Sequence, residues 1–157
     1  MDGHRKIKLK AIRLLSKREY SLCNIEKKLS LFASSCNPQV NFQTVKSVIE
    51  ELKSNDWISD ERAVECLINR KVSSCGIIKL RFELKKLGVC NDLIENHLLR
   101  VLSSEHERAL KLLMKKHKKL PSNLKEIVSQ KNFLMRKGFL AEVCNKVVND
   151  RLSQKLQ

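Results

Sequence analysis

Residues 60–89 decide the fold, and they read DERAVECLINRKVSSCGIIKLRFELKKLGV. Apolar residues recur there at steps of three and four, which is the period of an amphipathic helix. One stripe consists of Ala63, Val64, Leu67 and Ile68, and a second consists of Ile77, Leu80, Leu84 and Leu87. The acidic pair Asp60-Glu61 suits a helix start, and Gly88 suits a helix end. The stretch therefore predicts two short helices joined by a tight turn.

The same period continues along the chain and predicts nine short helices in three groups of three. Leu134-Met-Arg-Lys-Gly138-Phe139 repeats the Leu-x-x-x-Gly-apolar ending of Leu84–Val89, and Glu107-Arg108-Ala109 repeats Glu61-Arg62-Ala63 at a spacing of 46 residues. Helical units that recur at a fixed spacing indicate a modular array. We expect an all-α, elongated protein with repeats at 1–58, 59–103 and 104–157. In it Leu84 and Leu134 would be buried beside the C-cap glycines Gly88 and Gly138.

Finer details of these helices can also be predicted. The stripes include Leu102, Leu124 and Val128, so we expect these three side chains in the core. Most of the seven aromatic residues fall on apolar stripes and should pack there as well. Ser104-Glu105-His106-Glu107 has the spacing of a capping box at a helix start.

The composition excludes several classes of protein. The chain has 157 residues but only four glycines, and no two of these lie close enough for a phosphate-binding loop. No apolar run exceeds three residues, which indicates no membrane span and predicts a cytoplasmic protein. The six cysteines contain no Cys-x-x-Cys pair, and the four histidines have no paired spacing, so we predict no metal and no cofactor. Reduced, buried or half-buried thiols and the absence of enzyme activity are expected.

The charge points to a polyanion partner. Thirty-two basic residues face 17 acidic ones, for a net charge of +15, and residues 105–157 alone have thirteen basic and five acidic residues. Two basic stripes stand out: Lys6, Lys10, Arg13 and Lys17, and then Arg108, Lys111, Lys115 and Lys118 with Lys116 and Lys119 beside them. Like charges one turn apart repel, so an unopposed stripe favours a role in binding. Weak, non-specific contact with single- or double-stranded DNA is the prediction.

The decisive stretch resembles the central signature of the RecX regulatory proteins, in Asp60-Glu-Arg62-Ala-Val, Arg70-Lys71 and Gly76 to Val89. Arg18-Glu-Tyr20-Ser21 resembles the first-repeat motif of that family, and Lys131 to Phe139 resembles its third-repeat motif. The likeness runs from about residue 8 to residue 152. The chain departs from the family pattern at three places. Asn24-Ile25 stands where the family usually has an acidic residue followed by leucine. Asp56 stands where a glycine is common, and Ala63 where an aromatic residue is usual.

The resemblance implies three tandem three-helix repeats in a curved, elongated monomer. It implies that the chain binds in the groove of the RecA recombinase filament, as a regulator of recombination, DNA repair and the SOS response. Binding would inhibit recombinase ATP hydrolysis and strand exchange by blocking filament growth or promoting disassembly. Likeness and charge together nominate the following contact residues: Arg62, Arg70, Lys71, Lys79, Lys115, Lys116, Arg136 and Lys137.

Two other classes of protein compete with this interpretation. Residues 8–58 fit a winged-helix DNA-binding module with 45–53 as its recognition helix, but another helix rather than a β-wing is predicted next. Glu50 and Glu51 would also repel phosphate. A helical adaptor protein is the third possibility, and no motif in the sequence marks it.

Overall fold

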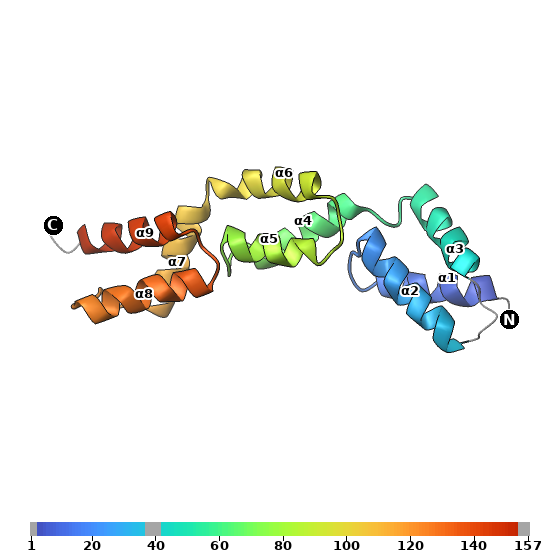
Figure 1. The fold of residues 1–157 in the computed structure, drawn as a ribbon, viewed down its shortest axis with the longest axis horizontal. Coiled ribbons are helices and arrows are strands. Elements are labelled where there is room, and N and C mark those ends of the chain that lie inside the picture. The colour runs from blue at the N-terminus through green and yellow to red at the C-terminus, as the bar shows by residue number, and fades with distance from the viewer. Residues whose placement is uncertain (1–2, 37–41, 154–157) are drawn as a thin grey trace. The chain divides into compact units, whose positions relative to one another are not determined.

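The computed structural model describes residues 3–36 and 42–153, and these fold into helices with no strand among them (Figure 1). The helices are α1 (Gly3–Leu15), α2 (Leu22–Cys36), α3 (Phe42–Ser54), α4 (Asp60–Lys71), α5 (Ile77–Lys85), α6 (Asn91–Leu102), α7 (Glu105–Lys116), α8 (Leu124–Arg136) and α9 (Ala141–Ser153). The all-α prediction of nine helices in three groups is confirmed for this part of the chain. None of the described helices combines the length and the apolar character that crossing a membrane requires.

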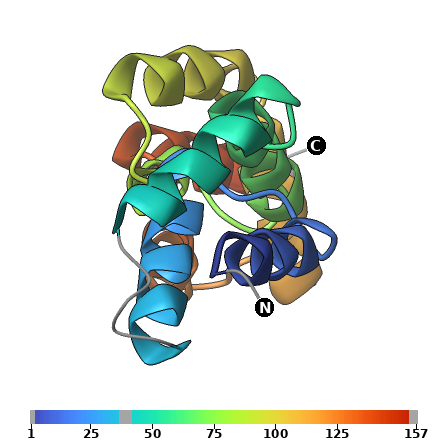
Figure 2. The ribbon, with the colours of Figure 1, turned by 90° about the vertical axis from the view of Figure 1, so that its right-hand side faces the viewer.

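The chain divides into two compact units, and the first consists of residues up to 66 together with 85–90. In it α1, α2 and α3 pack on one another around a shared apolar core (Figure 2). Each helix turns its predicted stripe inward; the central side chains are Ile7, Ala11, Ile25, Leu29, Val48 and Leu52. Burying each of the larger ones contributes about 1.5–3 kcal/mol, so the stripe of each helix holds this unit together.

The second unit consists of residues 67–84 and 91 onward. Its most compact part is formed by α7, α8 and α9, which pack around one core (Figure 1). The buried members of this core are Ala109, Leu113, Leu134, Phe139, Cys144, Val147 and Val148. The small residues Ala109 of α7 and Cys144 of α9 are both buried in this core, where α7 contacts α9, and Phe139 in the α8–α9 connection is buried with them.

The ends of α5 and α8 have the geometry that the two glycines predict. Gly88 has φ 69° and Gly138 has φ 84°, and both values lie in the left-handed region that glycine adopts without penalty. After α8, the Gly138 N–H donates to the Met135 carbonyl over 2.9 Å and the Phe139 N–H donates to the Leu134 carbonyl over 3.3 Å. This pattern is a Schellman C-cap. Leu84 and Leu134 are fully buried.

The capping-box prediction at Ser104 is wrong. The Ser104 side chain makes no capping hydrogen bond to α7; its hydroxyl donates to the Val101 carbonyl over 3.0 Å instead. A capping arrangement does occur at α8, where the Asn123 side chain accepts from the Glu126 N–H over 2.9 Å. The Glu126 carboxylate accepts in turn from the Ser122 N–H over 2.8 Å. Asparagine serves as well as serine at this position.

Several apolar residues that the stripes place in the core are exposed. Leu102, Leu124 and Val128 expose 39%, 80% and 53% of their surface. Among the aromatic residues only Tyr20 and Phe139 are buried, while Phe42, Trp57 and Phe82 are exposed. A helix stripe wider than its contact with neighbouring helices leaves its margins in solvent, so periodicity alone overestimates the core.

Candidate functional site

Five of the predicted contact residues lie at the end of α4, at the start of α5 and at the end of α8, and backbone hydrogen bonds join the last two segments. The Gly76 N–H donates to the Lys137 carbonyl over 2.9 Å, and the Ile78 N–H donates to the Gly138 carbonyl over 3.0 Å. These bonds place Lys79 beside Lys137, and Lys71 and Lys79 both lie near the Cys75 thiol. We call Arg70, Lys71, Lys79, Arg136 and Lys137 the basic junction.

The residues of the basic junction differ in solvent exposure and in whether their charged groups have a partner. Arg70, Lys79 and Arg136 are exposed, and none has a carboxylate partner among the described residues. Lys71 is half-buried and lies 3.5 Å from the Glu83 carboxylate. The Lys137 ammonium lies 5.8 Å from the centre of the Phe133 ring, within the range of a cation–π contact. Three guanidinium or ammonium groups are therefore available to an anionic partner.

Lys115 and Lys116 form a separate group at the C-terminal end of α7. Both are exposed, and the exposed Lys118 and Lys119 follow directly. Beside them lies a pocket of about 830 Å³ between the end of α7 and α8. The side chains that line it are Lys116, His117, Lys118, Lys119, Leu120, Ser122, Glu126, Ser129 and Gln130. Three lysines around one hollow, Lys116, Lys118 and Lys119, make a positive surface, which we call the α7–α8 pocket.

The basic stripe of α7 is shorter than the sequence indicates. Lys111 pairs with Glu107 one turn earlier over 2.7 Å, and the pKa of Glu107 is lowered by this hydrogen bond and charge. Arg108 is half-buried, and its guanidinium donates to the Val72, Cys75 and Val101 carbonyls over 2.8–3.0 Å. Burial lowers the pKa of Arg108. Only the C-terminal part of the stripe is free, which corrects the prediction of an unopposed stripe.

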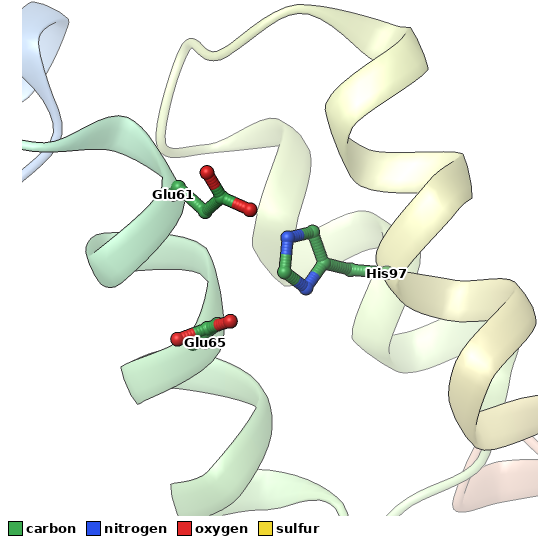
Figure 3. A group of neighbouring side chains, drawn as sticks. All are labelled: Glu61, Glu65 and His97. Atoms are coloured by element: carbon green, nitrogen blue, oxygen red, sulfur yellow. The ribbon is translucent and has the colours of Figure 1, made fainter.

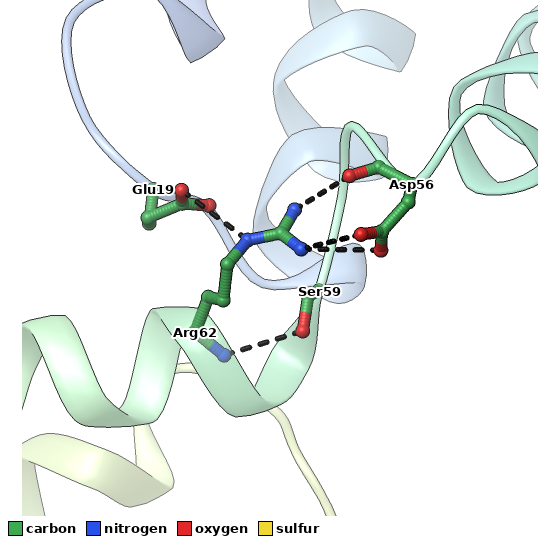
Figure 4. Close-up of polar contacts among 4 residues, drawn as sticks. All are labelled: Glu19, Asp56, Ser59 and Arg62. Carbon is green, nitrogen blue, oxygen red and sulfur yellow. Dashed lines mark hydrogen bonds and ion pairs between the residues drawn. The ribbon is translucent and has the colours of Figure 1, made fainter.

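Arg62 is engaged within the first unit (Figure 4). Its guanidinium donates to both Asp56 carboxylate oxygens over 3.1 Å and to the Asp56 carbonyl over 2.7 Å, and it lies 3.4 Å from Glu19. The hydrogen bond to Asp56 is the main reason that the pKa of Arg62 is raised. Asp56 has φ 53°, in the left-handed region that glycine adopts without penalty, which fits the glycine that the resemblance led us to expect at this position. Arg62 therefore holds the α3–α4 connection.

Two buried ionic side chains, Glu105 at the start and Arg151 near the end of the third helical group, are not predicted by the sequence pattern. Glu105 exposes 1% of its surface, and one of its carboxylate oxygens accepts from the Ile77 N–H over 2.9 Å. Arg151 exposes 3%; it donates to Gln130 over 3.1 Å and to the His117 carbonyl over 2.9 Å. Burial lowers the pKa of Arg151. No sequence signal marks them, because their partners lie 21 or more residues away.

The thiols and the group formed by Glu61, Glu65 and His97 are the remaining candidates for chemistry among the described residues. Cys75 and Cys144 are buried, and burial raises the pKa of both thiols, which makes them poor nucleophiles. Cys66 and Cys90 are exposed, unlike the buried or half-buried thiols predicted, and the Cys36 side chain lies outside the described residues. Figure 3 shows Glu61 and Glu65 a turn apart on α4, and His97 on α6. Exposed carboxylates with this spacing are common without an ion, so they assign no metal site.

An all-helical repeat protein with two exposed basic clusters belongs to the class of binding and regulatory proteins. The family pattern described as "RecX, third three-helix domain" matches residues 104–148. The regulatory protein RecX of Neisseria gonorrhoeae is 30% identical over 142 residues, which cover 90% of this chain and 88% of that protein. The regulatory protein RecX of Leptothrix cholodnii is 27% identical, with 90% and 87% covered.

Solved structures show the same fold. The crystal structure of RecX from Lactobacillus salivarius superposes with a TM-score of 0.78, at 19% identity, over 96% of this chain and 97% of that one. A second crystal structure of a regulatory protein RecX superposes with a TM-score of 0.74, over 95% of this chain and 72% of that one. The chain belongs to the RecX family of regulatory proteins. The winged-helix alternative does not fit this structure, because the helix α4 follows α3 where a winged-helix module has a β-wing.

Proposed function

We propose that the chain regulates the RecA recombinase by binding its filament on DNA, at substoichiometric amounts. Bound there, it inhibits ATP hydrolysis and strand exchange by blocking filament growth or promoting disassembly. The observation that supports this most is the pairing of RecX family membership with two exposed basic clusters in the second unit, the basic junction and the α7–α8 pocket. Non-enzymatic regulation in the cytoplasm, by a monomer, is part of the proposal.

The chemistry of the two clusters suits a filament that carries DNA. Free Arg and Lys groups gain by replacing the counterions of phosphates or by meeting acidic protein surfaces. Arg70 and Arg136 can each grip a phosphate or carboxylate with two parallel hydrogen bonds, whereas Lys79, Lys115 and Lys116 act as point charges. DNA contact through such groups is non-specific, because phosphate carries no sequence information.

Charge reversal tests the contact assignment. Lys115, Lys116, Arg136 and Lys137 are changed to Glu together, and inhibition of recombinase ATP hydrolysis on single-stranded DNA is compared with that of the unmodified chain. A matched control changes four exposed cations outside the clusters to Glu, namely Arg5, Lys27, Lys28 and Lys85. Both variants lose eight units of net charge, so a non-specific field effect would weaken both alike.

We expect the cluster variant to lose inhibition and the control variant to keep it, with an unchanged melting curve for each. Lys115, Lys116, Arg136 and the four control residues are exposed, and exposed charges contribute about 0–1 kcal/mol to folding. Lys137 is half-buried and adds its cation–π contact with Phe133, worth about 0.5–1 kcal/mol, so neither variant should unfold. Equal inhibition by the cluster variant and the unmodified chain would refute the contact residues. No inhibition by the unmodified chain would refute the proposed function.

A further inference from the structure

The α7–α8 pocket is lined by cations from the end of α7 and the segment that follows it. Lys116, Lys118 and Lys119 are all exposed, and none of them forms an ion pair within the described residues. One carboxylate, that of Glu126, also lies in the wall, but it accepts from the Ser122 N–H over 2.8 Å and from the Ser122 hydroxyl over 3.0 Å. The pocket therefore carries a net positive charge that its own carboxylate does not cancel.

One wall of the pocket holds a buried side-chain amide whose N–H groups are unused. Gln130 of α8 lines the pocket and exposes only 3% of its surface. Its side-chain oxygen accepts from the Arg151 guanidinium over 3.1 Å, which fixes the orientation of the amide. The amide nitrogen donates no hydrogen bond within the described residues. In that part of the chain Glu105 Oε2 is the one unpaired side-chain atom that is fully enclosed, so the Gln130 nitrogen is open to the pocket.

Arg151 of α9 adds a buried positive charge in contact with Gln130. Besides its bond to Gln130, its guanidinium donates to the His117 carbonyl over 2.9 Å and to the Lys119 carbonyl over 3.3 Å. No carboxylate partners it among the residues that the structure describes. A buried cation without a counter-ion costs free energy, and an anion bound nearby reduces that cost. The three hydrogen bonds also fix the pocket wall before a ligand arrives, which lowers the entropy lost on binding.

The remaining lining of the pocket supplies another donor and some apolar surface. The Ser129 hydroxyl is exposed and has no hydrogen-bond partner among the described residues. The His117 ring lies edge-on to the Phe133 ring with centres 5.5 Å apart, and Leu120 adds an apolar side chain. Lysine ammonium groups, an amide N–H and a hydroxyl all donate hydrogen bonds. A ligand that suits this lining is an anion with many acceptor oxygens.

The size of the pocket narrows the choice of anion. Its volume of about 830 Å³ lies in the range of pockets that hold small organic ligands, and it exceeds the space that a single small ion needs. Three ammonium groups around one hollow match a ligand with several negative charges. A nucleic-acid strand is bound instead along an extended basic groove with aromatic side chains for its bases. The pocket therefore favours a compact ligand with several charges.

We propose that the α7–α8 pocket binds a small anion that carries a chain of phosphate groups, the chemistry that inorganic polyphosphate and nucleoside triphosphates share. The three lysines neutralise the phosphate charge, and the Gln130 amide donates to a phosphate oxygen. This binding needs neither RecA nor DNA, so its failure would leave the proposed function untouched.

Titration of the isotope-labelled full chain, followed by NMR, tests the proposal. The probes are tripolyphosphate, ATP and adenosine, which lacks phosphate. We expect saturable shifts of the Gln130 side-chain amide and of the Lys118, Lys119 and Ser129 backbone amides with the first two probes and none with adenosine. Tighter binding of ATP would identify a nucleotide as the ligand, and equal or tighter binding of tripolyphosphate would identify the phosphate chain itself. Adenosine that binds as tightly as ATP, or shifts spread over basic residues elsewhere, would overturn the proposal.

Gln130→Glu separates ligand binding from folding. The variant keeps an oxygen that accepts from Arg151 and replaces the amide donor by a second carboxylate oxygen, which repels phosphate. We expect tripolyphosphate and ATP to bind about tenfold more weakly, without a fall in melting temperature. Asn132→Asp makes the same change of charge at an exposed residue of α8 outside the pocket and should alter the affinity by less than about threefold. Equal affinity of Gln130→Glu and the unmodified chain would overturn the proposal.

A second pair of variants tests the lysines. Lys118→Ala with Lys119→Ala should weaken binding about tenfold, whereas Lys125→Ala with Lys146→Ala, at two exposed lysines outside the pocket, should not. An equal loss in both pairs would mean that only the overall charge matters and would overturn the proposal. An oligothymidylate with hydroxyl ends, matched in phosphate concentration, should bind more weakly than tripolyphosphate. Equal affinity and the same shifts with this strand would assign the pocket to nucleic acid and overturn the proposal as well.

Discussion

Replacing Gly138 by alanine tests how the second unit is joined. Gly138 ends α8 with φ 84°, a conformation that costs a residue with a Cβ about 1–2 kcal/mol. The added Cβ would also lie 2.5 Å from the Cβ of Lys79 and 2.7 Å from its backbone nitrogen. The backbone nitrogen and the Cβ of Lys79 cannot move out of contact by a side-chain rotation. This overpacking therefore costs a further 1–3 kcal/mol or so. We expect Gly138→Ala to lower the free energy of unfolding by about 2–5 kcal/mol.

Gly88→Ala is the matched comparison. Gly88 has a similar left-handed φ of 69°, but the atoms nearest its added Cβ are the sulfur and Cβ of the Cys23 side chain. The Cys23 sulfur can rotate away, which leaves one close fixed atom, the Cys23 Cβ at 2.8 Å, against two closer ones at Gly138, so we expect Gly88→Ala to cost less than Gly138→Ala. Urea unfolding followed by circular dichroism at 222 nm measures both. A loss below about 0.5 kcal/mol for Gly138→Ala, or a larger loss for Gly88→Ala, would refute this account of the C-caps.

Four further predictions concern the core, the half-buried Arg108, the Cys75 thiol and DNA binding. Leu84→Ala and Leu134→Ala should each cost about 2–5 kcal/mol in urea unfolding, whereas Met135→Ala next door, at an exposed position, should cost under about 1 kcal/mol. Arg108→Ala should cost about 2–4 kcal/mol, since it leaves the Val72, Cys75 and Val101 carbonyls without their charged donor; Lys115→Ala on the same helix should be neutral in the same assay. Burial raises the pKa of the Cys75 thiol in the folded protein. The stability that the protonated thiol contributes is therefore present below the ordinary thiol pKa and is lost as the pH rises through the raised pKa. Urea midpoints measured from neutral to alkaline pH should fall less steeply in Cys75→Ala than in the unmodified chain. Affinity for duplex DNA should fall with salt at a log–log slope of about −0.9 per phosphate neutralised, and a slope near zero would contradict binding through Lys and Arg.

The local features of the fold could be predicted from the sequence because each depends on residues close together in the chain. The helix period and the C-cap glycines are short-range signals, so the helical groups, the buried Leu134 and the left-handed Gly138 all followed from spacing. The family resemblance added the repeat architecture. Neither required knowledge of which helix packs on which.

The errors concern contacts between distant parts of the chain. Arg108 looked like part of a solvated stripe, but its partners lie up to 36 residues earlier, and Glu105 caps a helix 28 residues earlier. Leu124 carried the core period, yet none of the described helices covers it and 80% of its surface is exposed. Periodicity reports which face of a helix is apolar and says nothing about whether another helix reaches it.

Among the candidate contact residues, too, the sequence pattern misses an interaction between residues that are distant in the chain. Charge and resemblance nominated eight cations. Five of them lie on the helix ends that form the basic junction, and Lys115 and Lys116 lie at the end of α7, where Lys116 lines the α7–α8 pocket. The eighth, Arg62, is bound by Asp56 and Glu19. Sequence could not show this, because the engagement of Arg62 depends on the left-handed turn at Asp56.

The most direct test of the central claim is cosedimentation of the chain with preassembled RecA filaments on single-stranded DNA. The chain is mixed with filaments, with the same DNA alone, or with recombinase that lacks DNA, at one fixed salt concentration. The account predicts that the chain pellets with filaments at well below one copy per recombinase protomer, and that little of it pellets with DNA alone. A chain that stays in the supernatant with filaments, or that pellets equally with bare DNA, would contradict the account.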